Sequence, residues 1–170
     1  RYLAVVRRQA DDLVFALDAE TGKLVWEAAE PGGLNLYAGK RDIWGPSPAY
    51  ADGRVFALGT TGRLRAYDAK SGKKLWETAH EAFIGGHTKG YSSFELSLFA
   101  LAGRVIVPTG GSVVVGVDAT TGEVAWEARL EGQYDKIQSR FANPGIWWHE
   151  GKPYLVYAGA RREGGGVVSL

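Results

Sequence analysis

Short apolar stretches alternate with turn-forming residues along the chain, and this pattern favours β-strands over helices. In the most regular segment the pattern predicts four strands, at residues 48–50, 54–58, 64–67 and 74–77. The breaks between these strands contain Gly, Asp, Ser and Thr, which are typical of tight turns. The 24 glycines and 6 prolines supply the turn residues that many short strands require. The sequence therefore predicts an all-β fold.

The same pattern recurs with a period of 50 residues. Three copies share the pattern D-A-x-[TS]-G-x-x-x-W-E, and their aspartates are 50 residues apart both times, as are their tryptophans. The shared positions are Asp18, Thr21, Gly22 and Trp26 in the first copy, Asp68, Ser71, Gly72 and Trp76 in the second, and Asp118, Thr121, Gly122 and Trp126 in the third. Four-stranded units of about 40 to 50 residues are typical of β-propeller blades.

A less regular fourth copy follows, with matching stretches at residues 146–151, 153–157 and 164–170. We expect residues 1–170 to form a single partial β-propeller domain of four-stranded antiparallel blades. Its blades are expected at about residues 1–30, 45–78, 94–130 and 139–170, which is about three and a half blades. In this register the residue after Leu170 would be the aspartate of the fourth copy. We therefore interpret the chain as a fragment of a propeller, or as part of an assembly of identical chains.

The repeated residues have a structural interpretation. A short carboxylate at the end of a strand accepts hydrogen bonds from the backbone of the turn that follows, and the Thr or Ser hydroxyl is placed to join it. The glycine supplies the positive φ of a tight hairpin. A tryptophan at the same place in every blade is expected to fill the gap between neighbouring blades. A scaffold repeats one solution, whereas a catalytic site needs a single constellation, so we assign these residues to the scaffold.

Composition excludes several classes of site. The net charge is +1 and charges of both signs are interleaved, so neither nucleic acid nor an anionic membrane is an expected partner. The basic charges are expected on the surface, and Asp11 and Asp12 are expected to be solvated turn residues. The chain has no cysteine, which excludes disulfides, thiolate metal sites and cysteine nucleophiles within it. It also has no apolar stretch long enough to span a membrane.

The pattern A-x-D-x-x-T-G-x-x-x-W resembles the tryptophan-docking motif of PQQ-type (pyrroloquinoline-quinone-type) propellers. Residues 16–26 match it fully, residues 66–76 match with Ser71 in place of threonine, and the third copy has Gly116 in place of alanine. The resemblance implies an eight-bladed propeller and an extracytoplasmic, periplasmic location. Kelch and WD-type repeats have other signatures that this chain does not reproduce.

The long loops between blades, at residues 28–45, 78–93 and 128–143, hold most of the residues that do not repeat. Long loops in a regular repeat are often functional. We expect a protein- or peptide-binding face there, anchored by Arg41, Trp44, Tyr91 and Arg140, because aromatic and arginine side chains dominate interface energetics. Trp44 is also open to interpretation as a packing residue, since Phe94 lies 50 residues later. The histidines His80, His87 and His149 lack a metal-binding spacing.

Three functions remain open on the sequence. The first is a non-catalytic propeller that acts as an interaction scaffold and needs no cofactor; the resemblance here is to the propeller lipoprotein of outer-membrane protein assembly. The second is a fragment of a quinoprotein alcohol or sugar dehydrogenase, which would bind PQQ and Ca²⁺. For that function Glu95 and Asn143 are the calcium-ligand candidates and Asp135 is a further one, because a hard cation prefers oxygen ligands. The third is an extracytoplasmic sensor domain of a larger protein.

Overall fold

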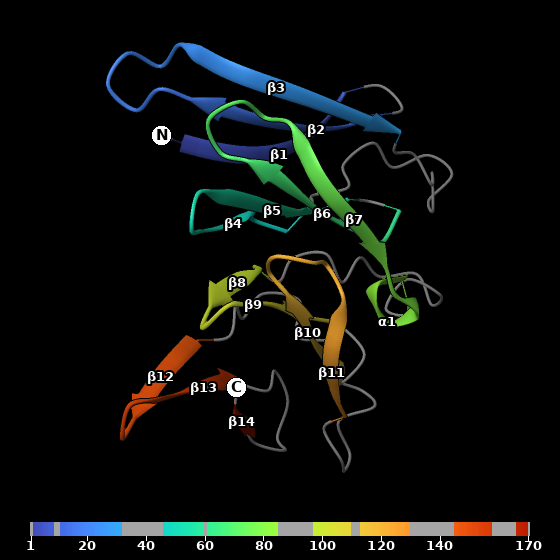
Figure 1. Cartoon of the computed structure of the whole chain (residues 1–170), viewed down its shortest axis with the longest axis vertical. Helices are drawn as coiled ribbons and strands as arrows, with labels where there is room; N and C mark the ends of the chain where they lie inside the picture. The colour runs from blue at the N-terminus through green and yellow to red at the C-terminus, as the bar shows by residue number, and fades with distance from the viewer. Residues whose placement is uncertain are drawn as a thin grey trace.

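The computed structural model describes residues 2–8, 11–31, 46–59, 61–84, 97–109, 113–129, 145–157 and 166–169. Nearly all of these residues lie in strands or in the tight turns that join them (Figure 1). The strands form four antiparallel sheets that follow one another along the chain, and the second and third sheets have four strands each. The predicted all-β fold built from four-stranded antiparallel units is therefore confirmed.

We call the four sheets blades 1 to 4 in chain order. Blade 1 contains β1 (Tyr2–Arg8), β2 (Asp11–Leu17) and β3 (Leu24–Pro31). Blade 2 contains β4 (Ala49–Ala51), β5 (Arg54–Leu58), β6 (Arg63–Asp68) and β7 (Lys74–Ala79), and the short helix α1 (Glu81–Ile84) follows it. Blade 3 contains β8 (Phe99–Leu101), β9 (Arg104–Pro108), β10 (Val113–Asp118) and β11 (Val124–Arg129). Blade 4 contains β12 (Gly145–His149), β13 (Lys152–Tyr157) and β14 (Gly166–Ser169).

The turns show which strands are equivalent. The turn between the first two strands of blade 2 has positive φ at both central residues, Asp52 and Gly53, which is the geometry of a tight two-residue hairpin. The same pair of positive φ values occurs in blade 3 and, at Glu150 and Gly151, in blade 4. β12 is therefore the first strand of its blade, like β4 and β8. β1 is the second strand of its blade, because β2 and β3 flank the D-x-x-T-G turn.

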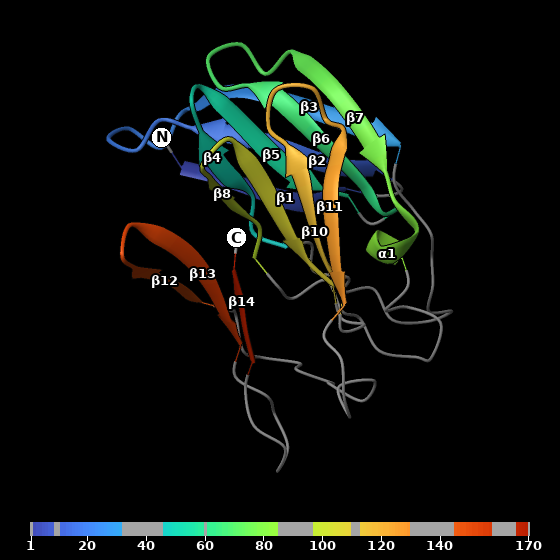
Figure 2. The ribbon, with the colours of Figure 1, turned by 60° about the horizontal axis from the view of Figure 1, so that its bottom comes forward.

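The blades lie side by side in chain order (Figures 1 and 2). In the two complete blades the first strands, β4 and β8, lie toward one side of the molecule and the last strands, β7 and β11, toward the other (Figure 1). β4 of blade 2 lies beside β8 of blade 3, and Trp76 and Thr78 of β7 bond to the turn that precedes β11. Each blade therefore packs on the next one through the faces of its sheet. This is the arrangement of neighbouring blades in a propeller.

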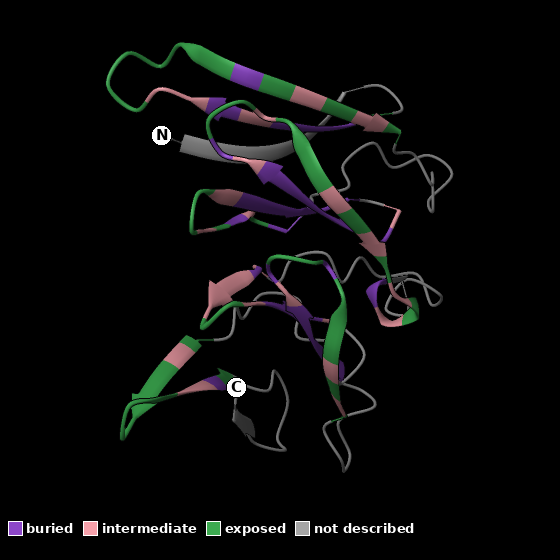
Figure 3. Ribbon diagram, in the orientation of Figure 1, coloured by how far each residue is buried: buried purple, intermediate pink, exposed green. Residues whose placement is uncertain are grey.

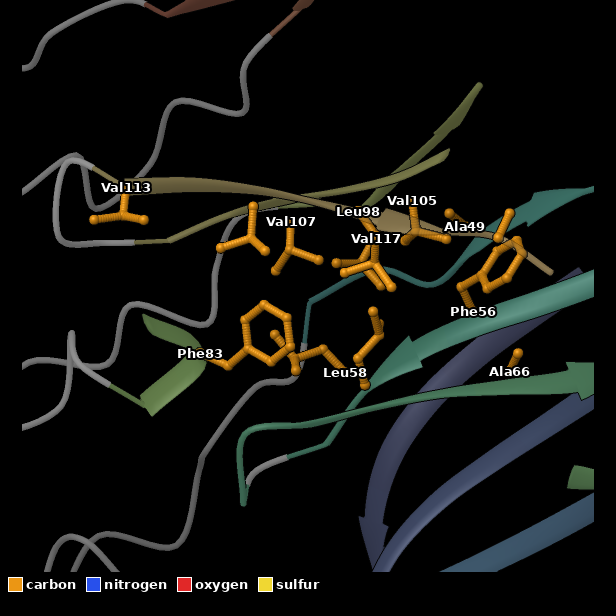
Figure 4. Packing of buried hydrophobic residues seen from close by; sticks show 13 residues of the cluster. Ala49, Phe56, Leu58, Ala66, Phe83, Leu98, Val105, Val107, Val113 and Val117 are labelled. Carbon is orange, nitrogen blue, oxygen red and sulfur yellow. The ribbon is translucent and has the colours of Figure 1, made fainter. Parts of the chain in front are cut away.

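Burial follows the position of the strand in its blade. The middle strands of blades 2 and 3, which are β5, β6, β9 and β10, are almost entirely buried. The outermost strands β3, β7 and β11 are mostly exposed or partly buried (Figure 3). Three apolar clusters fill the space between successive blades. In the largest, Phe83 extends from α1 toward Leu58 and Val107, so α1 closes the gap between blades 2 and 3 (Figure 4). In the described part of the chain, no helix has the length and apolar character needed to cross a membrane.

Candidate functional site

The D-x-x-T-G turns are built around one carboxylate oxygen each. In blade 2, Oδ1 of Asp68 accepts hydrogen bonds from the backbone N–H of Ser71 at 2.8 Å and from its hydroxyl at 2.7 Å. Asp18 makes the same two bonds with Thr21, at 2.9 and 2.7 Å. These bonds stabilise the ionised carboxylate, and they lower the pKa of Asp18 and Asp68 below its ordinary value. The carboxylates are thus occupied by their own turns.

The tryptophan of each of the first two blades docks on the turn of the next blade. The indole N–H of Trp26 donates to the carbonyl oxygen of Ala69 at 3.0 Å, and that of Trp76 donates to Ala119 at 3.2 Å. Each ring also covers the glycine of the receiving turn: a Cβ atom on Gly72 would lie 2.7 Å from the ring of Trp26. Positive φ and close approach of the ring therefore both require glycine there.

The third tryptophan lies differently. The ring of Trp126 packs onto Gly116 of its own blade so closely that a Cβ atom there would lie 2.2 Å from a ring carbon. The first two repeats have alanine at the position of Gly116. Glycine replaces it in the third repeat because only glycine leaves room for the ring of Trp126 in this position.

One group of charged side chains lies between blades 1 and 2, and the described residues of blade 3 hold no equivalent group. We call it the Arg65 cluster; it consists of Glu30 of β3, Arg63, Arg65 and Tyr67 of β6, and Lys74 and Glu77 of β7. The Arg65 side chain is only 4% exposed, and its Nε donates to Glu77 Oε2 at 2.7 Å. Glu30 reaches across from blade 1, with Oε2 at 3.0 Å from Lys74 Nζ and 3.8 Å from Arg65 Nε.

The surroundings of the Arg65 cluster shift the pKa values of two of its members, Glu77 and Tyr67. Arg65, followed by Arg63 and Lys74, stabilises the ionised form of Glu77 and lowers its pKa to about 2. Burial, with Glu30 and its hydrogen bond next, raises the pKa of Tyr67 well above its usual range. Tyr67 is therefore a hydroxyl donor, and its oxygen lies 3.4 Å from Glu30 Oε1.

Two of the sequence expectations were wrong here. Asp12 is only 2% exposed rather than solvated, because it lies in β2 and its side chain packs against Gly59 of blade 2, where a Cβ atom on the glycine would lie 2.5 Å from Asp12 Oδ2. Arg65 is buried rather than on the surface. A comparison of the repeats position by position would have found Arg65, because Phe15 and Val115 hold the equivalent places opposite Glu27 and Glu127.

The next interface has a different polar contact. His80, which is equivalent to Glu30, has its Nε2 at 3.4 Å from Glu127 Oε2 of blade 3. The hydroxyl of Thr78 also donates to the carbonyl oxygen of Gly122. Nδ1 of His80 accepts from the backbone N–H of Ala82 at 3.2 Å, which ties it to the start of α1. The two interfaces therefore share the tryptophan contact but carry different charged groups.

The first strand of blade 4 carries exposed aromatic side chains. Trp147 stacks on His149 with ring centres 4.9 Å apart and contacts Tyr154 at 5.3 Å. Trp147 and Trp148 are both largely exposed. The opposite face of the same sheet contacts blade 3 through Ile146 and Leu155.

The residues expected to bind a partner lie outside the described residues, namely Arg41, Trp44, Tyr91 and Arg140. The same holds for the calcium-ligand candidates Glu95 and Asn143, for Asp135 and for His87. Among the residues that the structure does describe, no three His, Cys, Asp or Glu side chains are grouped so that they would hold a metal ion.

The geometry defines a class of protein: a β-propeller whose blades are joined by tryptophans docked on D-x-x-T-G turns. A family model described as outer membrane protein assembly factor BamB matches residues 2–169, and the chain belongs to this family of PQQ-like propeller repeats.

Curated relatives fall into two groups. The dehydrogenase subunit of a quinone-dependent alcohol dehydrogenase from Komagataeibacter europaeus is 37% identical over 122 residues, which is 65% of this chain and 16% of the relative. The corresponding subunit from Acetobacter aceti is 34% identical over 167 residues, 90% of this chain and 22% of the relative. BamB from Escherichia coli (strain K12) is 26% identical over 86 residues, 51% of this chain and 22% of the relative. The chain thus spans about a fifth of the length of these relatives.

Solved structures show the same fold. BamB from Moraxella catarrhalis superposes with a TM-score of 0.59 at 19% identity, over 90% of this chain and 43% of that protein. A europium-containing methanol dehydrogenase superposes with a TM-score of 0.55 at 22% identity, over 76% of this chain and 24% of that protein.

Proposed function

We propose that this chain forms part of the propeller frame of a quinone-dependent alcohol dehydrogenase. The observation that carries the proposal is its identity of 37% over 122 residues with the dehydrogenase subunit of such an enzyme, against 26% over 86 residues with BamB. These identities favour the quinoprotein dehydrogenase over the interaction scaffold. In this proposal the blades hold the loops in place and supply no catalytic group.

The described residues contain no cluster of acidic or histidine side chains suited to a metal ion. Several of their carboxylates are engaged in turns or in ion pairs, such as Asp68 in its turn and Glu77 in the Arg65 cluster. We therefore derive no catalytic step from this part of the chain. The proposed calcium ligands Glu95 and Asn143 stay predictions.

The test is to prepare the protein that contains this segment with PQQ and Ca²⁺ and to measure dye-linked oxidation of ethanol. The proposal predicts a bound quinone chromophore and dye reduction that requires the alcohol, PQQ and Ca²⁺ together. The matched control is the same preparation without PQQ. A folded protein that binds no PQQ and reduces no dye would contradict the proposal.

A second candidate function is an interaction scaffold of the outer-membrane assembly type. The observations that favour it are the family model over residues 2–169 and the superposition on BamB. The prediction is that Trp44→Ala and Arg140→Ala weaken the binding of a protein partner by at least about tenfold each, since hot-spot residues contribute about 2 kcal/mol or more. Pull-down of the partner from a periplasmic extract, followed by titration with the purified partner, is the measurement. Unchanged affinity in both variants would exclude this role for the loops.

Under either function we propose an extracytoplasmic, periplasmic location. The support is the relationship to an outer membrane protein assembly factor and to quinone-dependent dehydrogenases. Fractionation of cells that express the full protein tests it, with the protein expected in the periplasmic or membrane fraction.

A further inference from the structure

Repeat proteins face a pairing problem, because blades of similar sequence and shape can pack in the wrong order or with a blade of another copy. In this chain the tryptophan contacts do not distinguish the first two interfaces, because Trp26 and Trp76 use the same hydrogen bond to the same turn position. The apolar contacts do differ, because Tyr67 stacks on Trp26 at the first interface. Phe56 and Phe83 belong to the second interface. Discrimination between blades therefore has to come from residues that do not repeat.

The Arg65 cluster contains such residues. Arg65 faces blade 1, and the equivalent residues of the other blades are Phe15 and Val115. Its partner position on the preceding blade is Glu30 in blade 1 and His80 in blade 2. Lys74 likewise has the apolar equivalents Leu24 and Val124. Glu77 is the one member that recurs, as Glu27 and Glu127.

We propose that the Arg65 cluster and the His80–Glu127 pair specify the order of the blades, so that blade 2 accepts only blade 1 and blade 3 accepts only blade 2. Each interface pairs an acidic side chain with a basic one. The preceding blade supplies the acidic side chain at the first interface and the basic one at the second. At the first interface Glu30 of blade 1 meets Lys74 and Arg65 of blade 2. At the second, His80 of blade 2 meets Glu127 of blade 3.

Incorrect pairings lose this complementarity. If blade 1 packed on blade 3, Glu30 would face Glu127 without a lysine or arginine at the positions of Val115 and Val124. If blade 2 packed on blade 2 of another copy, His80 would replace Glu30 and leave Lys74 without its acceptor across the interface. Like charges placed together and buried charges without a partner both disfavour an interface, so wrong pairings are penalised more than correct ones are stabilised.

The experiment separates specificity from stability. In the triple variant Glu30→Leu, Arg65→Val and Lys74→Val, each position takes the residue of the third repeat, 100 positions later for Glu30 and 50 positions later for Arg65 and Lys74. Glu77 keeps its ion pair with Arg63 in this variant but loses the one with Arg65, so the unfolding midpoint in urea should fall. The midpoint is therefore measured beside the oligomeric state, so that the two effects are told apart. After refolding from urea over a range of protein concentrations, the ratio of folded oligomer to monomer should rise about tenfold, which corresponds to about 1.4 kcal/mol of lost discrimination.

Size-exclusion chromatography with light scattering measures that ratio, and circular dichroism verifies that the oligomers retain β structure. The matched control is Arg104→Gln, which removes the exposed pair of Arg104 with Asp118 inside blade 3 and should leave the ratio unchanged. Unchanged monomer yield in the triple variant would overturn the proposal, as would an equal rise in the control. If the triple variant does not refold, the single variant Glu30→His is the test, because it gives blade 1 the residue that blade 2 has at this position. The proposal predicts a higher ratio of oligomer to monomer for Glu30→His. An unchanged ratio would overturn it.

Discussion

The indole N–H of Trp26 in blade 1 and the carbonyl oxygen of Ala69 in blade 2 are joined by a hydrogen bond of 3.0 Å across 43 residues of sequence. Ala69 follows the aspartate of the receiving turn, and its own N–H bonds to the carbonyl of Gly53 in the first hairpin of blade 2. The two halves of the repeated motif therefore serve different interfaces. The turn receives the tryptophan of the preceding blade, and the tryptophan of the same copy docks on the next.

The first prediction concerns these tryptophans. Trp26 is 8% exposed in the first interface, so Trp26→Ala should lower the free energy of unfolding by about 3–5 kcal/mol. Trp76→Ala should lower the free energy of unfolding by a similar amount, because the Trp76 ring packs against Phe56 and the turn of blade 3. Urea unfolding followed by circular dichroism measures both. Trp26→Phe is the control: it keeps a ring and loses the bond to Ala69, so it should cost less. A loss below about 1 kcal/mol for Trp26→Ala would show that the docking contact does not stabilise the interface.

The second prediction separates backbone strain from contact at the turn glycines. Gly22 and Gly72 have nearly the same positive φ, 68° and 73°, but a Cβ atom on Gly22 would meet nothing within 4 Å whereas one on Gly72 would meet Trp26. Gly22→Ala should therefore cost only the strain of alanine in the left-handed region, about 1–2 kcal/mol. Gly72→Ala should cost more, because it also displaces the ring of Trp26. Thermal and urea unfolding of the two variants provide the comparison, and equal costs would exclude a role for the ring contact.

The third prediction concerns Gly116. Gly116→Ala restores the residue of the first two repeats, yet it should destabilise blade 3, because the added Cβ would overlap the ring of Trp126. Overpacking of this kind costs about 1–3 kcal/mol. When Trp126→Leu has removed the ring, Gly116→Ala should no longer lower the free energy of unfolding. Urea unfolding of the four members of this cycle measures the coupling, and additive costs would contradict it.

The sequence was sufficient to predict the fold because the repeat specifies the architecture several times over. The glycine of the turn, the aspartate that caps it and the tryptophan on the returning strand recur at fixed spacing, and each has a local physical reason. The ends of the strands were predicted less well. β7, for example, continues to Ala79, beyond the last residue predicted, because Arg63 of β6 still pairs with it.

The Arg65 cluster was not predicted, because its members come from two blades and three strands. Nothing near Arg65 in the sequence distinguishes it from the basic residues at strand ends that face solvent. Its burial depends on Glu30, which lies 35 positions earlier and on another blade. The sequence does contain one signal, which is a break in the repeat. The position that is Phe15 in the first copy and Val115 in the third is Arg65 in the second. A polar residue at one copy of an otherwise apolar position is the signal that points to such a contact.

The last prediction follows from the charge on Glu77. Its pKa falls from 4.5 to about 2 on folding, mainly through the hydrogen bond from Arg65, so the folded state binds this proton more weakly than the unfolded state. The ionised carboxylate therefore contributes its full stabilisation above about pH 4.5, and the contribution is lost as the pH falls toward 2. Glu77→Gln should be less stable than the parent chain at pH 7, and the difference should shrink steadily between pH 4.5 and 2. Urea unfolding of both proteins across this range is the measurement. The turn aspartates titrate in both proteins, so their contribution cancels in the difference. A difference that stays constant with pH would show that the ionised form of Glu77 is not stabilised by Arg65.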